Sequence, residues 1–356
     1  MADKALLVGI NNYKSISPLS GCLNDIANLK TLLTNDFGFN EANIDQLVEE
    51  DAIYTNIEDS LMSLIQQAEE GDRLVFHFSG HGSFIDSEND DEAMDELICL
   101  HNMDWDDPDS YLVDDDIGAL LEDVKPGVCM TVILDACHSG TGTKAFSAAG
   151  RSVKNPSAKS RLLIINDAQK TMTKGLARNI DAKSNQSNQQ LVHKDAKPPV
   201  ARFVLPPPSI QQRITAAKLN RVGEHLADDD YNHQLLAGAD AIQTAADAYI
   251  DGMYQGAFTY HLCSSSRELG EGVSAQSVFA NAKSKMRTAG YHQTPQLEGI
   301  RKQDRLFGGE ATEEADLSGG IVTNRSSTQV FADLIRVQEK FLDLSSQFLG
   351  LERRET

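Results

Sequence analysis

Two stretches decide the fold expected of this chain: LVFHFSGHG at residues 74–82 and TVILDACHSG at residues 131–140. Each begins with a short apolar run, which is typical of a strand buried in a parallel sheet. His81 follows the first run and Cys137 follows the second. Because open α/β sheets place their active sites beyond the carboxyl ends of the strands, we expect the two side chains to meet at one edge. A thiolate with an imidazole nearby can attack a carbonyl carbon.

The chain around these stretches alternates between strand and helix patterns. Further strands are expected over 5–10, 44–48, 97–100 and 235–239, the last as the final strand. Helices are expected over 22–35, 55–69, 117–121, 257–264 and 274–289. A capping box at Thr55 and Glu58 is expected to open the second of these helices. Strands alternating with helices predict an α/β fold with a mostly parallel central sheet and helices on both faces.

The net charge of −21 argues against nucleic acid as a partner, since phosphates repel such a surface. No apolar stretch is long enough to cross a membrane, and no secretory signal is visible, so no membrane partner is expected. The five cysteines are odd in number and scattered, without the spacing of a metal site. These features favour a reducing, cytoplasmic location.

Charge and composition divide the chain into five predicted parts. A large half that contains His81 and Cys137 covers 1–165, a polar, basic loop with prolines covers 166–230, and a smaller half covers 231–308. A linker at 309–327 leads to an amphipathic heptad helix at 328–352. This helix either folds back on its own domain or mediates self-association or partner docking.

Small residues surround His81 and Cys137. Gly80 and Gly82 permit a tight turn and close approach of a substrate. If the pair is catalytic, the backbone N–H groups of Gly82 and Cys137 are natural donors to an oxyanion.

The sequences SGHG at 79–82 and DACHSG at 135–140 resemble the two catalytic motifs of the caspase-like cysteine peptidases, in particular the metacaspases and bacterial orthocaspases. The resemblance extends to GCLND at 21–25, YLVDDD at 111–116, QTAAD at 243–247 and QTPQ at 293–296. It covers roughly residues 4–308 and implies a caspase-like three-layer sandwich.

This resemblance also implies roles for particular residues. Cys137 would be the nucleophile and His81 the general acid/base. Asp25 and Asp135 would line the S1 pocket, with Cys22 and Ser79 beside them. Two carboxylates there would select Arg or Lys before the cleaved bond. Simpler roles are a helix N-cap for Asp135 and a solvated first-turn acid for Asp25.

Asp247 is a further candidate for the pocket wall, with a capping or surface role as the alternative. Many family members require calcium, and Asp95, Asp114 and Asp115 align with calcium ligands. A fourth acid of the family pattern is missing, because Lys144 stands near its place. Replacement oxygens could come from Asp86, Glu88, Asp90 and Asp91. The alternative is a solvated acidic loop.

The basic segment from Arg151 to Arg221 gives the expected enzyme a substrate within its own chain. A Lys/Arg-rich loop beside a protease specific for basic residues predicts self-cleavage there. The alternative is a basic loop that docks on the acidic body without being cut. The sequence therefore predicts a calcium-stimulated cysteine endopeptidase that cuts proteins or peptides after Arg or Lys. Two other readings are a partner-activated protease of a bacterial defence or signalling system and a non-enzymatic caspase-like scaffold.

Overall fold

The structure is a computed structural model that describes residues 2–85, 95–136, 198–210, 233–239, 244–299 and 301–309. Cys137, Lys144 and the acids between Asp86 and Asp91 lie outside the described residues. So do most of the basic segment, most of the predicted linker and the whole predicted helix at 328–352. The division of the chain into five parts therefore stays a prediction.

A six-stranded sheet forms the centre of the described fold, in the order β12-β9-β7-β3-β1-β2. Its strands are β1 (Asp3–Gly9), β2 (Ile44–Val48), β3 (Arg73–Ser79), β7 (Cys129–Asp135), β9 (His233–Ala237) and β12 (Gln296–Glu298). The first five pair in parallel, and β12 joins the edge antiparallel to β9. The two apolar runs of the sequence are thus β3 and β7, which are neighbours along their whole length.

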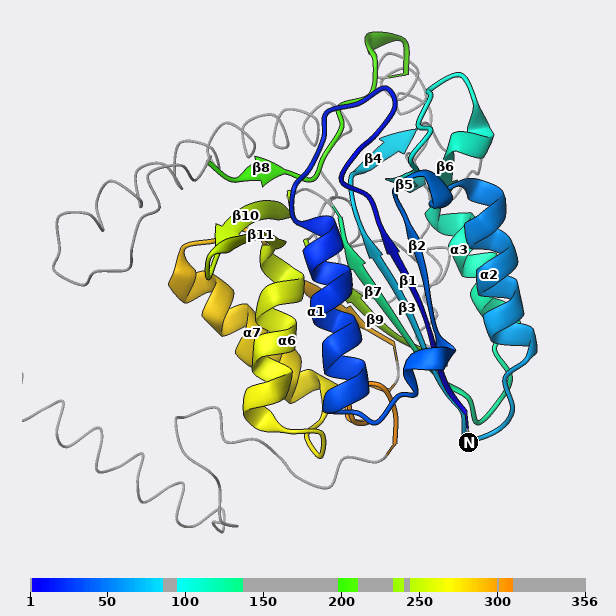
Figure 1. Cartoon of the computed structure of the whole chain (residues 1–356), viewed down its shortest axis with the longest axis vertical. Helices are drawn as coiled ribbons and strands as arrows, with labels where there is room; N and C mark the ends of the chain where they lie inside the picture. Colours follow the sequence, from blue (N-terminus) through cyan, green and yellow to red (C-terminus); the bar gives the residue numbers. More distant parts are fainter. Residues whose placement is uncertain are drawn as a thin grey trace, which may run out of the picture. The chain divides into compact units, whose positions relative to one another are not determined.

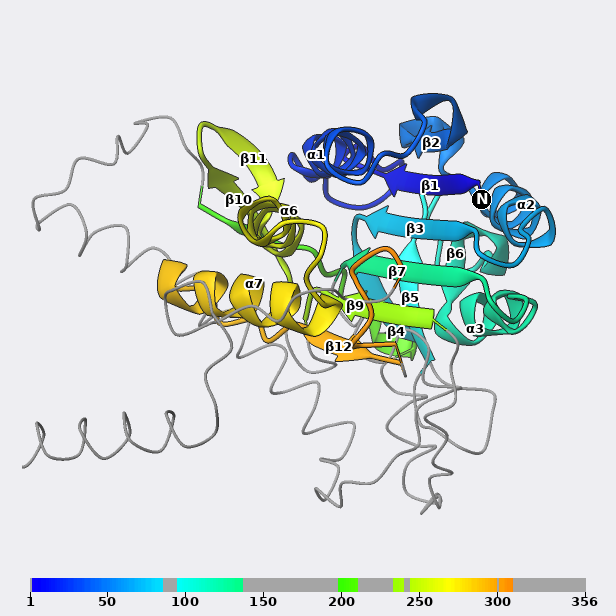
Figure 2. The same cartoon turned by 90° about the horizontal axis from the view of Figure 1, so that it is seen from below.

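Helices cover both faces of this sheet, as Figures 1 and 2 show. α1 (Cys22–Asn35), α6 (Ala257–Leu269) and α7 (Ala275–Ala289) lie on one side. α2 (Tyr54–Gln66) and α3 (Asp114–Glu122) lie on the other. Phe76 of β3 and Val132 of β7 pack into one core cluster with Leu61 of α2. Because side chains alternate along a strand, Ser79 and Asp135 face the α1 and α6 side.

Two small antiparallel sheets lie at the end of the molecule where β3 and β7 finish (Figure 1). One joins β4 (Gly82–Ile85), β5 (Asp95–Cys99) and β6 (Tyr111–Val113), and the other joins β8 (Val200–Ala201), β10 (Ala246–Ile250) and β11 (Met253–Gly256). Three short 3-10 helices, Glu41–Asn43, Glu49–Asp51 and Pro108–Ser110, connect other elements.

The predicted α/β class and mostly parallel sheet are confirmed, but two local expectations are wrong. α2 begins at Tyr54 with Ile53 as its N-cap and no side-chain cap, so Thr55 and Glu58 form no capping box. The strand at 233–237 is not the last one, because β10, β11 and β12 follow it. These strands are only three to five residues long, too short to show a clear period of two. Within the described residues, no helix has the length and apolar character needed to span a membrane.

Candidate active site

His81 lies two residues beyond the end of β3, after Gly80, and is fully buried, at 0% exposure. Its imidazole Nε2 lies 2.9 Å from the carbonyl oxygen of Ser17. Its backbone N–H donates to the Tyr13 hydroxyl at 2.8 Å, and the Tyr13 ring packs against the imidazole. The loop between β1 and α1 therefore fixes both the main chain and the ring of the histidine.

The hydrogen bond to Ser17 determines which nitrogen of His81 carries the proton. A carbonyl oxygen only accepts, so Nε2 must be the donor and Nδ1 must carry the lone pair. Nδ1 is buried and has no hydrogen-bond partner among the described residues. Burial lowers the pKa of His81 to about 4, against the opposing effect of the Ser17 bond. The imidazole is therefore neutral at pH 7, and its free nitrogen can accept a proton.

Cys137 lies outside the described residues, but the strand that leads to it is well defined. β7 ends at Asp135, and the next residue, Ala136, is fully buried. Cys137 follows Ala136 in the chain. The backbone N–H of Gly80, just before His81, donates to the carbonyl oxygen of Asp135 at 3.5 Å. The ends of β3 and β7 are thus joined next to the two predicted catalytic residues.

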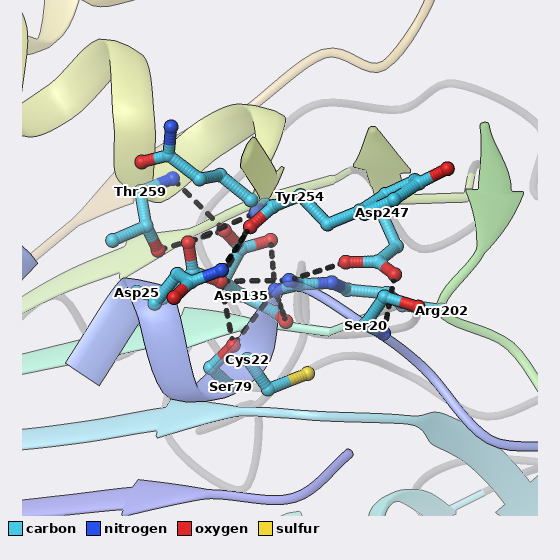
Figure 3. Close-up of polar contacts among 12 residues, drawn as sticks. Ser20, Cys22, Asp25, Ser79, Asp135, Arg202, Asp247, Tyr254 and Thr259 are labelled. Carbon is cyan, nitrogen blue, oxygen red and sulfur yellow. Dashed lines mark hydrogen bonds and ion pairs between the residues drawn. The ribbon is translucent and has the colours of Figure 1, made fainter. Parts of the chain in front are cut away.

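A completely buried arginine, Arg202, lies beyond these strand ends (Figure 3). Its Nη2 donates to Asp25 Oδ2 at 2.7 Å and to Asp247 Oδ1 at 3.1 Å. Its Nη1 donates to Ser79 Oγ at 2.8 Å and to the carbonyl oxygen of Asp135 at 3.0 Å. The Asp135 carboxylate lies 3.3 Å from the same nitrogen. Three carboxylates thus surround one guanidinium.

Asp25 is held from several sides. The Gly256 N–H donates to Asp25 Oδ1 at 2.9 Å, and the Ser79 hydroxyl donates to Oδ2 at 2.8 Å. Burial raises the pKa of Asp25 to about 7, although Arg202 acts to lower it. Burial would lower the pKa of Arg202, but nearby acidic groups raise it well above its usual value. The arginine therefore stays charged, and its charge favours the ionised form of Asp25.

Asp135 is fixed by the first turn of α6. The backbone N–H and the hydroxyl of Thr259 donate to Asp135 Oδ2 at 2.8 and 2.7 Å. His77 Nε2 lies 3.3 Å from the same hydroxyl, and burial lowers the pKa of His77 to about 3. Since the Thr259 proton goes to Asp135, the neutral imidazole of His77 donates to Thr259. A buried chain of hydrogen bonds therefore orients this carboxylate.

Asp247 lies on β10, in the other half of the sequence, and closes the group. Its Oδ2 accepts the backbone N–H of Ser20 at 2.8 Å, while its Oδ1 contacts Arg202. Asp247 is 2% exposed, so it is not a surface acid. Cys22 is fully buried at the start of α1, close to Ser79, and burial raises the pKa of its thiol, which keeps it neutral.

The chain around Arg202 is extended and paired on both sides. Before it, β8 pairs with β10 antiparallel, so that Val200 lies opposite Asp247. The Arg202 N–H donates to the carbonyl oxygen of Ala245 at 2.9 Å. The Arg202 carbonyl oxygen accepts the N–H of Gly82 at 3.0 Å. The backbone of Arg202 also acts to raise the pKa of His81, although burial lowers it more strongly. The carbonyl of Arg202 thus lies on the predicted oxyanion donor, beside the histidine.

The acids expected to bind calcium lie elsewhere. Asp95 begins β5, while Asp114 and Asp115 open α3 directly after β6, the partner of β5. Asp95 and Asp114 are buried and Asp115 is half-buried. Carboxylates are ligands that suit calcium. However, no group of three or more acidic, His or Cys side chains that could hold a metal occurs in the described part of the chain.

The structure therefore brings together Asp25, Asp135, Ser79, Cys22 and Asp247, with His81 and Gly82 alongside. Asp25 is not a solvated acid, because its exposure is 0%. Sequence reasoning missed Thr259, Gly256, Tyr13 and Ser17, and it counted Arg202 only as one of many basic residues. A signal for Gly256 existed, because it directly precedes a predicted helix.

Comparison with known proteins gives matches to one family. The family described as "Metacaspase, peptidase C14 domain" matches residues 3–145. Metacaspase-4 of Arabidopsis thaliana is 38% identical over 148 residues, which cover 39% of this chain and 34% of that protein. Metacaspase-1 of Eremothecium gossypii is 35% identical over 145 residues, which cover 39% of this chain and 32% of that protein. The chain spans about a third of the length of these curated relatives.

Among solved structures, protein GSU0716 from Geobacter sulfurreducens superposes with a TM-score of 0.53 at 20% identity. The superposition covers 83% of this chain and 92% of that chain, and at this identity it shows a shared fold alone.

A parallel sheet between two helical layers, with a buried histidine and an acidic pocket beyond its strands, defines a caspase-like α/β domain. The family match makes this more specific. Residues 3–145, which include His81, Asp25, Asp135 and Cys137, match the family described as "Metacaspase, peptidase C14 domain".

Proposed function

We propose that the protein is a cysteine endopeptidase that cleaves after Arg or Lys. The position of Arg202 carries this proposal: its guanidinium is enclosed by three carboxylates while its carbonyl oxygen accepts the Gly82 N–H. Charge-assisted hydrogen bonds of this kind select a cationic side chain. The metacaspase match supports cysteine peptidase chemistry over 3–145.

The proposed mechanism combines Cys137 with the described groups at the ends of β3 and β7. Nδ1 of His81 accepts the Cys137 thiol proton, and the thiolate sulfur then bonds to the carbonyl carbon. The Gly82 N–H stabilises the negative charge that develops on the carbonyl oxygen. The bond from carbon to the amide nitrogen breaks as the imidazolium returns its proton to that nitrogen. Water then attacks the thioester, giving a free carboxylate and restoring the thiol.

Self-cleavage belongs to the same proposal, with Arg202–Phe203 as the bond that is cut. Residues 200–204 already lie across the site as an extended segment paired on both sides. Arg202 falls within the basic segment in which self-cleavage is expected. In the uncut chain this segment fills the pocket, so the enzyme is expected to need self-cleavage, or release of the segment, before it acts on other proteins.

We also propose that calcium stimulates the enzyme. The family resemblance and the carboxylates of Asp95, Asp114 and Asp115 at one end of β5 support this proposal. No step of the mechanism above uses the ion.

A reducing, cytoplasmic setting and protein or peptide substrates complete the proposal. Cys22, Cys99, Cys129 and Cys263 form no disulfides, which fits a reducing compartment. The net charge of −21 disfavours nucleic acid as a partner. Association through the helix at 328–352 stays a prediction.

The proposal predicts a clear pattern of hydrolysis. Purified protein with calcium is expected to cleave fluorogenic peptides ending in Arg or Lys, and to cleave matched Asp peptides at least a hundredfold more slowly. Cys137→Ala is expected to abolish turnover, because it removes the nucleophile. Excess chelator is expected to reduce the rate. No turnover under any condition would favour the scaffold function, and turnover that chelator leaves unchanged would remove calcium from the proposal.

The raised pKa of Asp25 predicts a pH dependence. A cationic substrate needs the ionised carboxylate, so kcat/KM for an Arg peptide should rise as pH increases through about 7. With the pocket empty, the favourable effect of Arg202 is lost and the rise should move higher. His81, whose pKa is lowered to about 4, contributes no rise in this range. In Asp25→Asn this rise at or above pH 7 should disappear and kcat/KM should fall about a hundredfold. An unchanged pH profile in this variant would contradict the assignment.

A further inference from the structure

We propose that strand β4 and the residues beyond β9 form a binding site for a large apolar side chain, preferably aromatic, on the residue that follows the cleaved bond. The proposal rests on the proposed function, because it takes Arg202–Phe203 as the bond that is cut. It assigns a second specificity site on the opposite side of that bond from the acidic pocket.

The side chain of Phe203 indicates this site. Phe203 is 6% exposed, and its ring stacks on the ring of Phe84, with centroids 6.0 Å apart and planes 25° from parallel. The two rings belong to an apolar cluster with Ala239 and Ala245, and Ile85 and Trp105 pack against it. Stacked aromatic pairs add attraction beyond the burial of apolar area.

Four residues around Phe203 belong to the body of the fold, whereas Ile210 of the same cluster and Ala201, which packs against it, lie in the segment 198–210. Phe84 and Ile85 are on β4, Ala239 follows β9, and Ala245 directly precedes β10. None of these residues is part of the described segment 198–210 that contains Phe203. When that segment leaves, Phe84, Ile85, Ala239 and Ala245 remain for the corresponding residue of another substrate.

The main chain places the following residue against these four residues. Gly82 donates its N–H to the Arg202 carbonyl oxygen at 3.0 Å and accepts the N–H of Val204 at 3.1 Å through its own carbonyl. The Ser83 hydroxyl donates to the Val204 carbonyl oxygen at 2.6 Å. β4 thus holds the chain beyond the bond in the way that a sheet edge holds an added peptide strand. These contacts involve only the substrate backbone, so they apply to any sequence.

The class of side chain follows from these four residues. The Phe84 ring, Ile85 and two alanines are apolar contacts, so burial against them favours an apolar side chain over a charged one, which would lose hydration. A glycine would lose the stacking contact with the Phe84 ring. Burial of a phenylalanine at such a site is expected to favour it over glycine by roughly tenfold to a hundredfold.

Internally quenched peptides test the inference with the full-length, calcium-treated, self-cleaved enzyme. The sequences Val-Ala-Arg-Phe-Val, Val-Ala-Arg-Gly-Val and Val-Ala-Arg-Glu-Val differ only after the arginine. The expected order of kcat/KM is Phe, Gly, Glu, with Phe exceeding Gly by roughly tenfold or more. Equal rates for Phe and Gly would overturn the aromatic site while leaving the Arg peptidase intact. No cleavage of any peptide would contradict the proposed function, and the site with it.

Two variants connect the preference to Phe84. In Phe84→Ala the ratio of kcat/KM for the Phe and Gly peptides should fall to less than threefold. Phe84→Leu, which keeps more of the packing, should give an intermediate ratio. Phe39→Ala is the matched control, because Phe39 is also buried but packs against Phe307 and Arg73. Its ratio should equal that of the wild type. A full preference for Phe in both Phe84 variants would overturn the assignment.

Discussion

Arg202→Gln is expected to leave the chain uncut between residues 202 and 203, whereas the wild type is expected to be cleaved there. The glutamine keeps a hydrogen-bonding side chain but removes the charge that binds Asp25, Asp135 and Asp247. Breaking a buried ion pair by removing one partner typically costs about 3–5 kcal/mol. Intact-mass analysis after addition of calcium measures the cut. Arg202→Lys should still be cleaved, and Arg213→Gln is the control for a basic residue of the same segment. Normal cleavage at this bond in Arg202→Gln would contradict the assignment.

Arg202→Gln should also lower the free energy of unfolding, by an amount that depends on pH. Burial already raises the pKa of Asp25, and without Arg202 the pKa rises further. The folded state then holds a proton that the unfolded state has released, so the free energy of unfolding falls as pH increases above about 4. Denaturant unfolding at pH 5 and pH 8, in the Cys137→Ala background, measures this difference. A loss of stability that is equal at both pH values would show that the buried acids do not cause it.

Gly256→Ala is expected to reduce kcat/KM for Arg peptides by more than a hundredfold. Gly256 precedes α6 with φ −67° and ψ 127°, a conformation that alanine adopts without strain. An added Cβ would contact the Asp135 carboxylate and lie 2.5 Å from Arg202 Nη1 and 2.7 Å from Asp25 Oδ2. The methyl group would therefore occupy the space of the guanidinium. Displacing a bound group by about 1 Å can cost a hundredfold in rate.

A second glycine separates this effect from a general loss of stability. Gly252 has φ +91° and open space where a Cβ would be added. Gly252→Ala therefore strains the backbone without filling the pocket, and its kcat/KM should stay close to that of the wild type. Thermal unfolding of both variants monitors the fold. Wild-type kinetics in Gly256→Ala would show that the pocket described around Arg202 is not the one that binds substrate.

The elements that shape the sheet were largely predictable from local patterns. The apolar runs before His81 and Cys137 form adjacent parallel strands, and α1 spans the predicted residues 22–35. Such runs carry their signal in the chain itself, because burial on both faces of a sheet requires continuous apolar sequence. The short strands β10 to β12 lack this signal, since three to five residues do not establish a period.

The acidic pocket could be predicted only in part. Asp25 and Asp135 are recognisable because they belong to motifs, but Thr259 and Gly256 contribute mainly through backbone N–H groups and a missing side chain. A backbone N–H donor is the same for every residue type except proline, so the sequence does not reveal it. Arg202 could not be singled out among the basic residues between Arg151 and Arg221, because its distinction is its position in three dimensions.

The three carboxylates around Arg202 come from parts of the chain that are far apart, Asp25 on α1, Asp135 at the end of β7 and Asp247 on β10. Like charges this close repel each other in a buried site unless a cation lies between them. The ion pairs of Arg202 therefore also connect the first and the last thirds of the described fold. If cleavage at this bond releases Arg202, the three carboxylates would depend on the next bound cation to offset their mutual repulsion. Small guanidinium compounds would then inhibit the enzyme and protect it against unfolding through the same contacts.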